Sequence, residues 1–303
     1  MSEKLKIAIC VSGQTRHFNE DPAYLDDFNK LLGLFDEYDY DLFGHTWADQ
    51  EDPRPGVLKR FTEYRSDPQS IIWDAITPSP DTNNIHWTAF LTTRSEWMQK
   101  PEYIDIINNK SDINFIDFAK DQIYGQIGQV WSAHESFLLT KNHAGNKYDF
   151  VVKLRWDTMI RKHVLDHQGR VQSNTDDSIN RFKEQLYNWS HCLNQWNFKT
   201  CDKYPSCLSL DNCVISERGN PYINDHLYVF KFNHFKNSIL AHSPYDLFIR
   251  VLKEGSNNGG LGSAHSLWIK WILNSGFSVS PILPDIFTPN GPGENKPNKE
   301  WCN

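Results

Sequence analysis

The chain has 303 residues, of which 14% are aromatic, and a formal net charge of −7 at pH 7. Its length allows a large hydrophobic core. Its negative charge argues against a protein held mainly by phosphate neutralisation, although a local basic groove stays compatible with it. The sequence contains no apolar run of membrane-spanning length and no signal segment. We therefore expect a cytoplasmic protein without a membrane partner, whose six cysteines are thiols.

The first predicted element is a buried strand over residues 7–11, which runs into a polar loop with Ser12, Gly13, Gln14 and Arg16. Gly13 permits a tight turn, and Ser12 and Gln14 offer hydrogen bonds. The planar guanidinium of Arg16 suits a diphosphate or the carbonyls of uracil. An ordinary strand-to-helix turn would explain the same residues. A P-loop is excluded because the Gly-Lys-Ser/Thr element is absent.

The next elements continue an α/β pattern. Apolar residues at three- and four-residue spacing predict a helix over residues 22–35, and the strand at 41–46 should return parallel to the first. His45 lies near its end, either as a buried structural histidine or as a ligand contact. We expect a helix over residues 87–97 and a longer one over residues 118–143.

The stretch Phe150 to Leu154 reads as a buried strand, and it ends in Arg155-Trp156-Asp157. A cation and an anion two residues apart in a strand point to the same side. At the end of a parallel strand, they would lie where open α/β sheets bind ligands. A surface salt bridge at a strand end is the alternative.

The second half contains a polar, aromatic-rich insertion over about residues 164–205, helical over 177–196. Four cysteines lie close together in the sequence, in this insertion and directly after it, and are either buried thiols or zinc ligands: Cys192, Cys201, Cys207 and Cys213. A strand is expected at 227–232, directly after Asp225 and His226. A glycine-rich loop over 253–265 precedes a helix in whose first turn His265 would meet an anion.

Three segments together carry a resemblance: Ser12-Gly13-Gln14-Thr15-Arg16, Asp41-Leu42-Phe43-Gly44-His45-Thr46-Trp47 and Arg155-Trp156-Asp157. They resemble the GT-A class of nucleotide-sugar glycosyltransferases, and more closely a bacterial and phage group with SGQxR, DxFxHTW and RxD motifs. The resemblance covers about Lys6 to Pro284. It implies an α/β, GT-A-like fold, with a mixed, mainly parallel sheet flanked by helices. The expected catalytic domain is 1–285, including the insertion, followed by a Pro-rich tail at 286–303.

The resemblance implies transfer of a sugar from a nucleoside diphosphate sugar, UDP-linked, to a hydroxyl acceptor. That acceptor is a saccharide or, as for some phage enzymes, a hydroxymethylated base in DNA. A phage-encoded protein would act in the host cytoplasm. The implied donor-binding residues are Ser12, Gly13, Gln14, Arg16, His45, Gln126, Arg155 and Asp157.

The resemblance also suggests catalytic roles. Asp225 is the candidate base, Asp157 a second catalytic residue and a ligand for Mn²⁺ or Mg²⁺, His265 a phosphate contact, and the 253–265 loop a lid. A full D-x-D motif is absent because position 155 is Arg, so metal dependence stays open. A non-catalytic nucleotide- or carbohydrate-binding protein on the same fold is the alternative. A hydrolase is disfavoured because no G-x-S-x-G or H-E-x-x-H motif is present.

Overall fold

The computed structural model has a seven-stranded sheet at its centre, with strand order β10-β8-β9-β4-β1-β2-β3. The strands are β1 (Lys6–Ser12), β2 (Asp39–Trp47), β3 (Trp87–Thr92), β4 (Phe150–Arg155), β8 (Cys213–Ser216), β9 (Leu227–Lys231) and β10 (Ser278–Ser280). The structure describes residues 4–13, 28–47, 87–92, 96–97, 99–101, 104, 123–143, 148–156, 158–160, 163–165, 171–191, 213–216, 226–246, 264–280 and 287–289.

Most strands of the sheet share one direction. β1 is parallel to β2 and to β4, and β2 is parallel to β3. β9 is antiparallel to both of its neighbours, β4 and β8, whereas β10 is parallel to β8. The mixed, mainly parallel sheet with helices on both faces confirms the expected α/β class.

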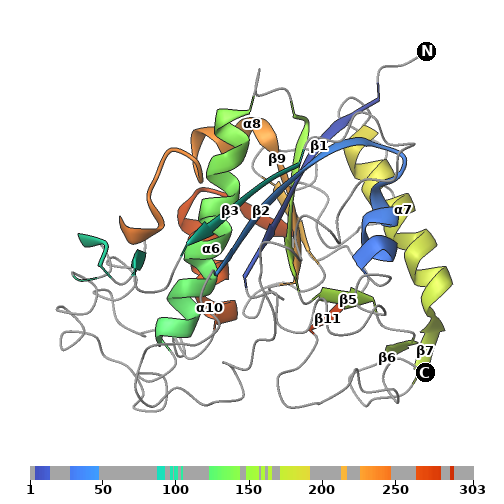
Figure 1. Cartoon of the computed structure of the whole chain (residues 1–303). Helices are drawn as coiled ribbons and strands as arrows, with labels where there is room; N and C mark the ends of the chain where they lie inside the picture. The colour runs from blue at the N-terminus through green and yellow to red at the C-terminus, as the bar shows by residue number, and fades with distance from the viewer. Residues whose placement is uncertain are drawn as a thin grey trace.

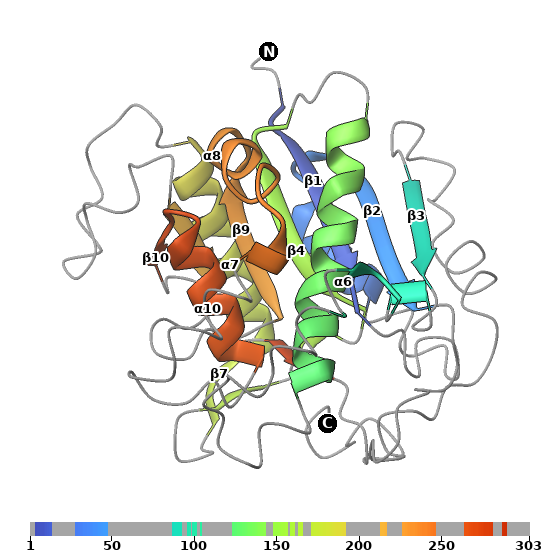
Figure 2. The same ribbon diagram turned by 90° about the vertical axis from the view of Figure 1, so that its left-hand side faces the viewer.

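Helices cover both faces of the sheet (Figures 1 and 2). On one face lie α6 (Ile123–Asn142), α8 (Phe232–Asn237) and α10 (Ala264–Asn274). On the other lie α7 (Thr175–His191) and the 3₁₀ turn η1 (Gly33–Phe35), which continues a helical segment at residues 28–32. Since β-strand side chains alternate, Ile7, Ile9 and Val11 pack toward α7, whereas Ala8 and Cys10 pack toward α6.

Two small sheets lie outside the central one. β5 (Thr158–Ile160) pairs antiparallel with β11 (Phe287–Pro289), and β6 (His163–Leu165) pairs antiparallel with β7 (Val171–Asn174). The insertion is therefore regular where it is described: a β-ribbon and then α7, which begins two residues before the position expected from the sequence.

One element differs from the sequence-based expectation. Residues 87–92 form the edge strand β3, so the prediction of a helix over 87–97 is wrong for this part. The segment Trp-Thr-Ala-Phe-Leu-Thr is rich in aromatic and β-branched residues, which favour a pleated strand. The strands β1, β2, β4 and β9 and the helices α6 and α10 occur where the sequence predicts them. The remaining short strands were not predicted. Among the described residues, none of the helices has the length and apolar character needed to cross a membrane.

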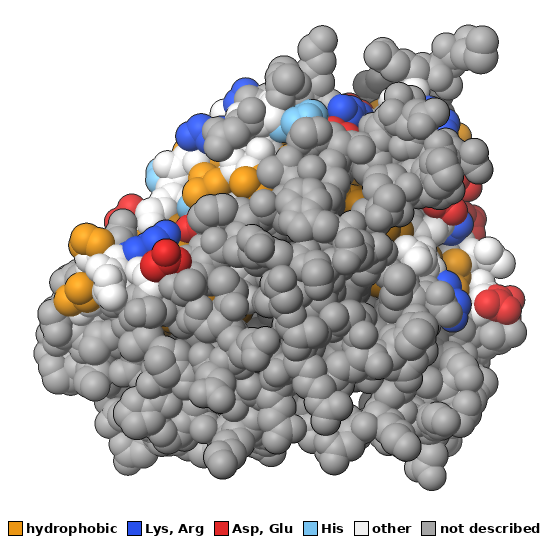
Figure 3. All heavy atoms as spheres, viewed as in Figure 1, with side chains coloured by type: hydrophobic (Ala, Val, Ile, Leu, Met, Phe, Trp, Pro, Cys, Tyr) orange, Lys and Arg blue, Asp and Glu red, His pale blue; other side chains and the backbone are white. Residues whose placement is uncertain are grey.

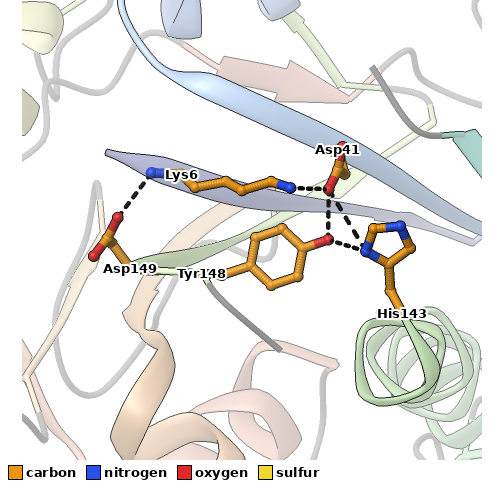
Figure 4. Close-up of polar contacts among 5 residues, drawn as sticks. All are labelled: Lys6, Asp41, His143, Tyr148 and Asp149. Carbon is orange, nitrogen blue, oxygen red and sulfur yellow. Dashed lines mark hydrogen bonds and ion pairs between the residues drawn. The ribbon is translucent and has the colours of Figure 1, made fainter. Parts of the chain in front are cut away.

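A polar network joins the amino ends of β1, β2 and β4 to the end of α6 (Figure 4). Asp41 is buried and accepts hydrogen bonds from Lys6 Nζ at 2.9 Å and from Tyr148 Oη at 2.6 Å. His143 Nδ1 lies 2.9 Å from the same phenol oxygen, and Asp149 accepts the backbone N–H of Lys6 at 2.8 Å. Because the phenol proton goes to Asp41, the imidazole N–H donates to Tyr148. This amino-end cluster fixes α6 on the sheet at the edge opposite to the candidate site.

Candidate functional site

The candidate site lies at the carboxyl ends of β1, β2 and β4. In the strand register, Ser12 is the partner of His45 on one side and of Arg155 on the other. All three side chains occupy the face covered by α6, because they share the alternation of Cys10 and Val151. A hydroxyl, an imidazole and a guanidinium therefore stand in one row at the edge where open α/β sheets bind ligands.

Ser132 on α6 connects the ends of β1 and β2. Its Oγ accepts the backbone N–H of Gly13 at 2.8 Å and lies 2.7 Å from His45 Nδ1. Gly13 has φ +101°, a conformation that side-chain-bearing residues rarely adopt. The glycine thus turns the chain sharply after β1, and Ser132 holds that turn.

His45 is fully buried, and burial lowers its pKa to about 3, with a smaller contribution from the positive charge of Lys100. The ring is therefore neutral at physiological pH. A neutral imidazole adds no positive charge to the site, so the charge that the described edge offers to an anion comes from the strand β4.

Trp156 links the ends of β1 and β2 by hydrogen bonds, and its side chain lies on the face of the sheet covered by α7. Its backbone N–H donates to the Ser12 carbonyl at 3.4 Å, and its indole Nε1–H donates to the His45 carbonyl at 2.9 Å. The indole ring stacks on Phe28 at 5.9 Å between centroids. The middle residue of the R-x-D motif is thus a structural anchor, which fixes the backbone directly after Arg155.

Two cations follow each other on the same face of β4. Arg155 is buried at the edge, and Lys153 is completely buried one step further inside. The ammonium of Lys153 lies 5.2 Å from the ring centroid of Tyr228 and 4.7 Å from that of Trp268, which favour a cation electrostatically. A positive charge in a low-dielectric position acts strongly on a nearby anion.

The first part of α6 forms a wall beside this edge. Ser132 lies level with Gly13, and His143 lies level with Tyr148 at the opposite edge. The residues of α6 before Ser132 make up roughly 13 Å of helix at 1.5 Å per residue. In Figure 1 this end of α6 extends beyond the ends of the strands. This part carries Gln126, and it carries Gln129, which is half-buried.

The other site residues expected from the sequence remain predictions. Asp157, Gln14, Arg16 and Asp225 lie outside the described residues, and so does nearly all of the loop 253–265. Gln126 and His265 lie on α6 and α10 as expected, but their side chains are not among those described. Within the described ranges, acidic, histidine and cysteine side chains form no cluster suited to a metal ion. Cys192, Cys201 and Cys207 fall outside these ranges.

The sequence analysis missed two residues of the edge. Lys153 was assigned only to a buried strand, although a lysine inside such a run is an unusual core residue. Ser132 was passed over because a single serine in a helix carries little information. A signal was present, however: Ser132, Ser136 and Thr140 recur at four-residue spacing along the buried face of α6.

Comparison with known proteins gives distant likenesses in structure alone. Neither a protein-family model nor a curated protein matches the sequence. Among solved structures, the crystal structure of the galactosyltransferase LgtC in complex with donor and acceptor sugar analogues is similar, with 11% identity, a TM-score of 0.36 and coverage of 91% of this chain and 72% of that chain. An active-site mutant of LgtC is similar at 11% identity and a TM-score of 0.38, with coverage of 91% and 71%. These values are too low to assign an activity to this chain.

Proposed function

We propose that this chain is a glycosyltransferase that moves a sugar from a UDP-linked donor to a hydroxyl acceptor. The observation that carries the proposal is the row formed by Ser12 and Arg155 at the carboxyl ends of parallel strands, with the buried Lys153 behind it. An anionic diphosphate is the ligand for which such an edge is suited, since its charge can be met by Arg155 and the inner cation.

The chemistry requires that negative charge on the leaving diphosphate be stabilised as the bond to the sugar breaks. We assign this role to Arg155, assisted by Lys153 through its field and by Arg16 of the first loop. Ser12 offers a hydroxyl next to Arg155 for a donor oxygen. Asp225, which directly precedes the buried His226 and β9, is the proposed base that takes the acceptor proton.

A divalent cation could share in neutralising the diphosphate. Among the described side chains at the strand ends the edge offers a hydroxyl, cations and the imidazole of His45, whose Nδ1 bonds Ser132, and no carboxylate of the kind that Mn²⁺ or Mg²⁺ prefers. The carboxylate for such an ion is Asp157, which follows the anchored Trp156. We propose Asp157 as the residue that would hold the ion or orient the donor ribose. Chelation with EDTA, followed by return of Mn²⁺ or Mg²⁺, separates the two roles.

The acceptor remains a choice between a saccharide and a hydroxymethylated base in DNA. The described part of the insertion favours the saccharide. Trp189 is buried and packs on Phe150 at 4.9 Å between ring centroids, so it fills the core and leaves no free face for a base. On α7, Arg181 is exposed beside the acidic residues Asp177 and Glu184. Lys and Arg side chains likewise lie beside Asp and Glu over the described part of the face in Figure 3.

The first experiment is a thermal-shift screen of nucleoside diphosphates and their sugars, with and without Mn²⁺. A site saturated at a hundredfold excess over its dissociation constant adds about 2.7 kcal/mol to the free energy of unfolding. UDP and UDP-sugars should raise the melting temperature more than the other nucleotides. The donor-site proposal fails if none of these compounds changes it.

The second experiment separates the enzyme from a binding protein on the same fold. The protein is incubated with a UDP-sugar and either oligosaccharides or hydroxymethylcytosine DNA, and the products are weighed by mass spectrometry. A gain of one sugar mass identifies the acceptor. Modification of DNA should weaken steeply between low and moderate salt, because phosphate contacts release counterions. Binding without any transfer would favour the non-catalytic alternative.

A further inference from the structure

Ser132 uses its hydroxyl in two directions. Its oxygen accepts the N–H of Gly13 at 2.8 Å, and His45 Nδ1 lies 2.7 Å away. The same hydroxyl therefore bonds Gly13 and His45, and the tautomer of the neutral ring decides whether Nδ1 accepts the hydroxyl proton or donates to the oxygen. The chain of hydrogen bonds runs from the backbone of the first loop, through the helix α6, to the end of β2.

This arrangement has a consequence for ligand contacts. The Gly13 amide and the Nδ1 atom of His45 are both engaged by Ser132, so neither is available to a bound molecule. Their place at the sheet edge had suggested direct donor contacts. Ser12 and Arg155 are their neighbours in the strand register.

We infer that Ser132 is a positioning residue, which holds Gly13 and His45 as a fixed frame and so sets the affinity of this edge of the sheet for the donor nucleotide. This inference rests on the proposed function. Gly13 is buried, but it has no side chain whose packing could hold the turn, and the space where a Cβ would lie is empty to 4 Å. The hydrogen bond from α6 supplies the restraint, and α6 is itself anchored to the sheet through the amino-end cluster.

The test compares two buried serines on the same helix. Ser136 lies one turn after Ser132 and is equally buried, but its hydroxyl donates only to the Ala133 carbonyl of α6, at 2.7 Å. Ser132→Ala removes the link to the loop, and Ser136→Ala removes a hydroxyl of the same size without touching it. Ser132→Thr keeps the hydroxyl. UDP binding is measured by titration calorimetry, and the ring nitrogens of His45 are followed by NMR in protein labelled with ¹⁵N-histidine.

Ser132→Ala should weaken UDP binding about tenfold, since the turn at Gly13 loses its restraint and binding must then order it. Ser136→Ala should bind UDP as the wild type does, and Ser132→Thr should recover most of the affinity. The His45 nitrogen signals should shift in Ser132→Ala and stay in place in Ser136→Ala. Equal affinities for the two alanine variants, or unchanged His45 signals in Ser132→Ala, overturn the inference.

A second pair of variants covers the case in which Ser132→Ala does not fold. In His45→Asn the side-chain amide lies close to the place of Nδ1 and can accept from Ser132 or donate to it, whereas His45→Ala offers no partner. His45→Asn should therefore bind UDP more tightly than His45→Ala. Equally weak binding of both variants overturns the inference and makes His45 a direct contact. A wild type that binds no UDP refutes the proposed donor site itself, and the inference falls with it.

Discussion

Two buried histidines should make the free energy of unfolding fall steeply in mild acid. Burial is the main cause that lowers the pKa of His45 to about 3 and that of His134 to about 4. In the unfolded chain both rings take up a proton near pH 6.5. The stabilisation from these neutral rings is therefore complete above pH 6.5, and it is lost as the pH falls toward the folded-state values.

The size of the effect follows from the displacement of the pKa values. Between pH 7 and pH 5 each histidine costs about 2 kcal/mol of folding free energy, at about 1.4 kcal/mol per unit, so the pair costs about 4 kcal/mol. The assay is urea unfolding of the wild type and of His134→Gln at both pH values. His134 packs against Trp271 at 6.0 Å between ring centroids, away from the candidate site. The variant should lose about 2 kcal/mol less than the wild type on acidification.

The comparison uses the difference between the free energies of unfolding at pH 7 and pH 5. A packing loss in the variant that is the same at both pH values therefore cancels. Carboxylates that titrate in the same interval contribute equally to both proteins. The double variant His45→Asn with His134→Gln should lose still less of its free energy of unfolding. An identical pH dependence for the wild type and His134→Gln would refute the reasoning, because it would show that the folded protein accommodates the charged ring.

Three further outcomes are expected. Asp157→Asn should lower turnover by about 10²–10³ and leave the urea midpoint unchanged, because it removes a charge at the reacting edge; near wild-type turnover would leave Asp157 as a salt-bridge partner only. Tyr148→Phe should lower the free energy of unfolding at pH 7 by about 1–3 kcal/mol, since Asp41 loses a buried donor. Burial, followed by Asp41, raises the pKa of Tyr148 far above its ordinary value, so the wild type should lose more stability above pH 10 than Tyr148→Phe, and parallel alkaline curves would contradict this. In urea unfolding, Gly13→Ala should lower the free energy of unfolding by about 1–2 kcal/mol, through its positive φ alone. Gly128→Ala, whose Cβ would meet Trp47 at 3.4 Å, should leave it unchanged or raise it by up to about 1 kcal/mol. Equal effects of the two variants would contradict the role given to the positive φ of Gly13.

The sequence predicts the parallel half of the sheet well, because the strand that contains Ile9 and, apart from Lys153, the strand that contains Val152 are short apolar runs that end in polar turns. It predicts α6 and α10 for a similar reason, since their buried residues recur at helical spacing. The reversed direction of β9 was not predicted. Strand direction depends on how the chain returns to the sheet, and the residues of a strand buried on both faces do not encode it.

The site was predicted in position more than in detail. The sequence brings Ser12, His45 and Arg155 to one edge, because they end strands that share a sheet. Which of their atoms a ligand can reach depends on Ser132, which comes from the helix α6. Which atoms of Gly13 and His45 are engaged follows from Ser132, more than eighty positions away in the chain from either. Spacing within a motif carries no information about such a contact.

The pairing of β5 with β11 has a consequence for the order in which the protein acquires its site. Thr158 pairs with Pro289, and Ile160 pairs with Phe287, so the strand that begins two residues after the anchored Trp156 receives its partner from far downstream. A ribosome releases residues 287–289 long after β1, β2 and β4 can pair. A nascent chain can therefore build the central strands and yet lack the neighbour of β5. Fusion tags or deletions that disturb residues 287–289 would act next to Trp156, although they lie far from it in sequence.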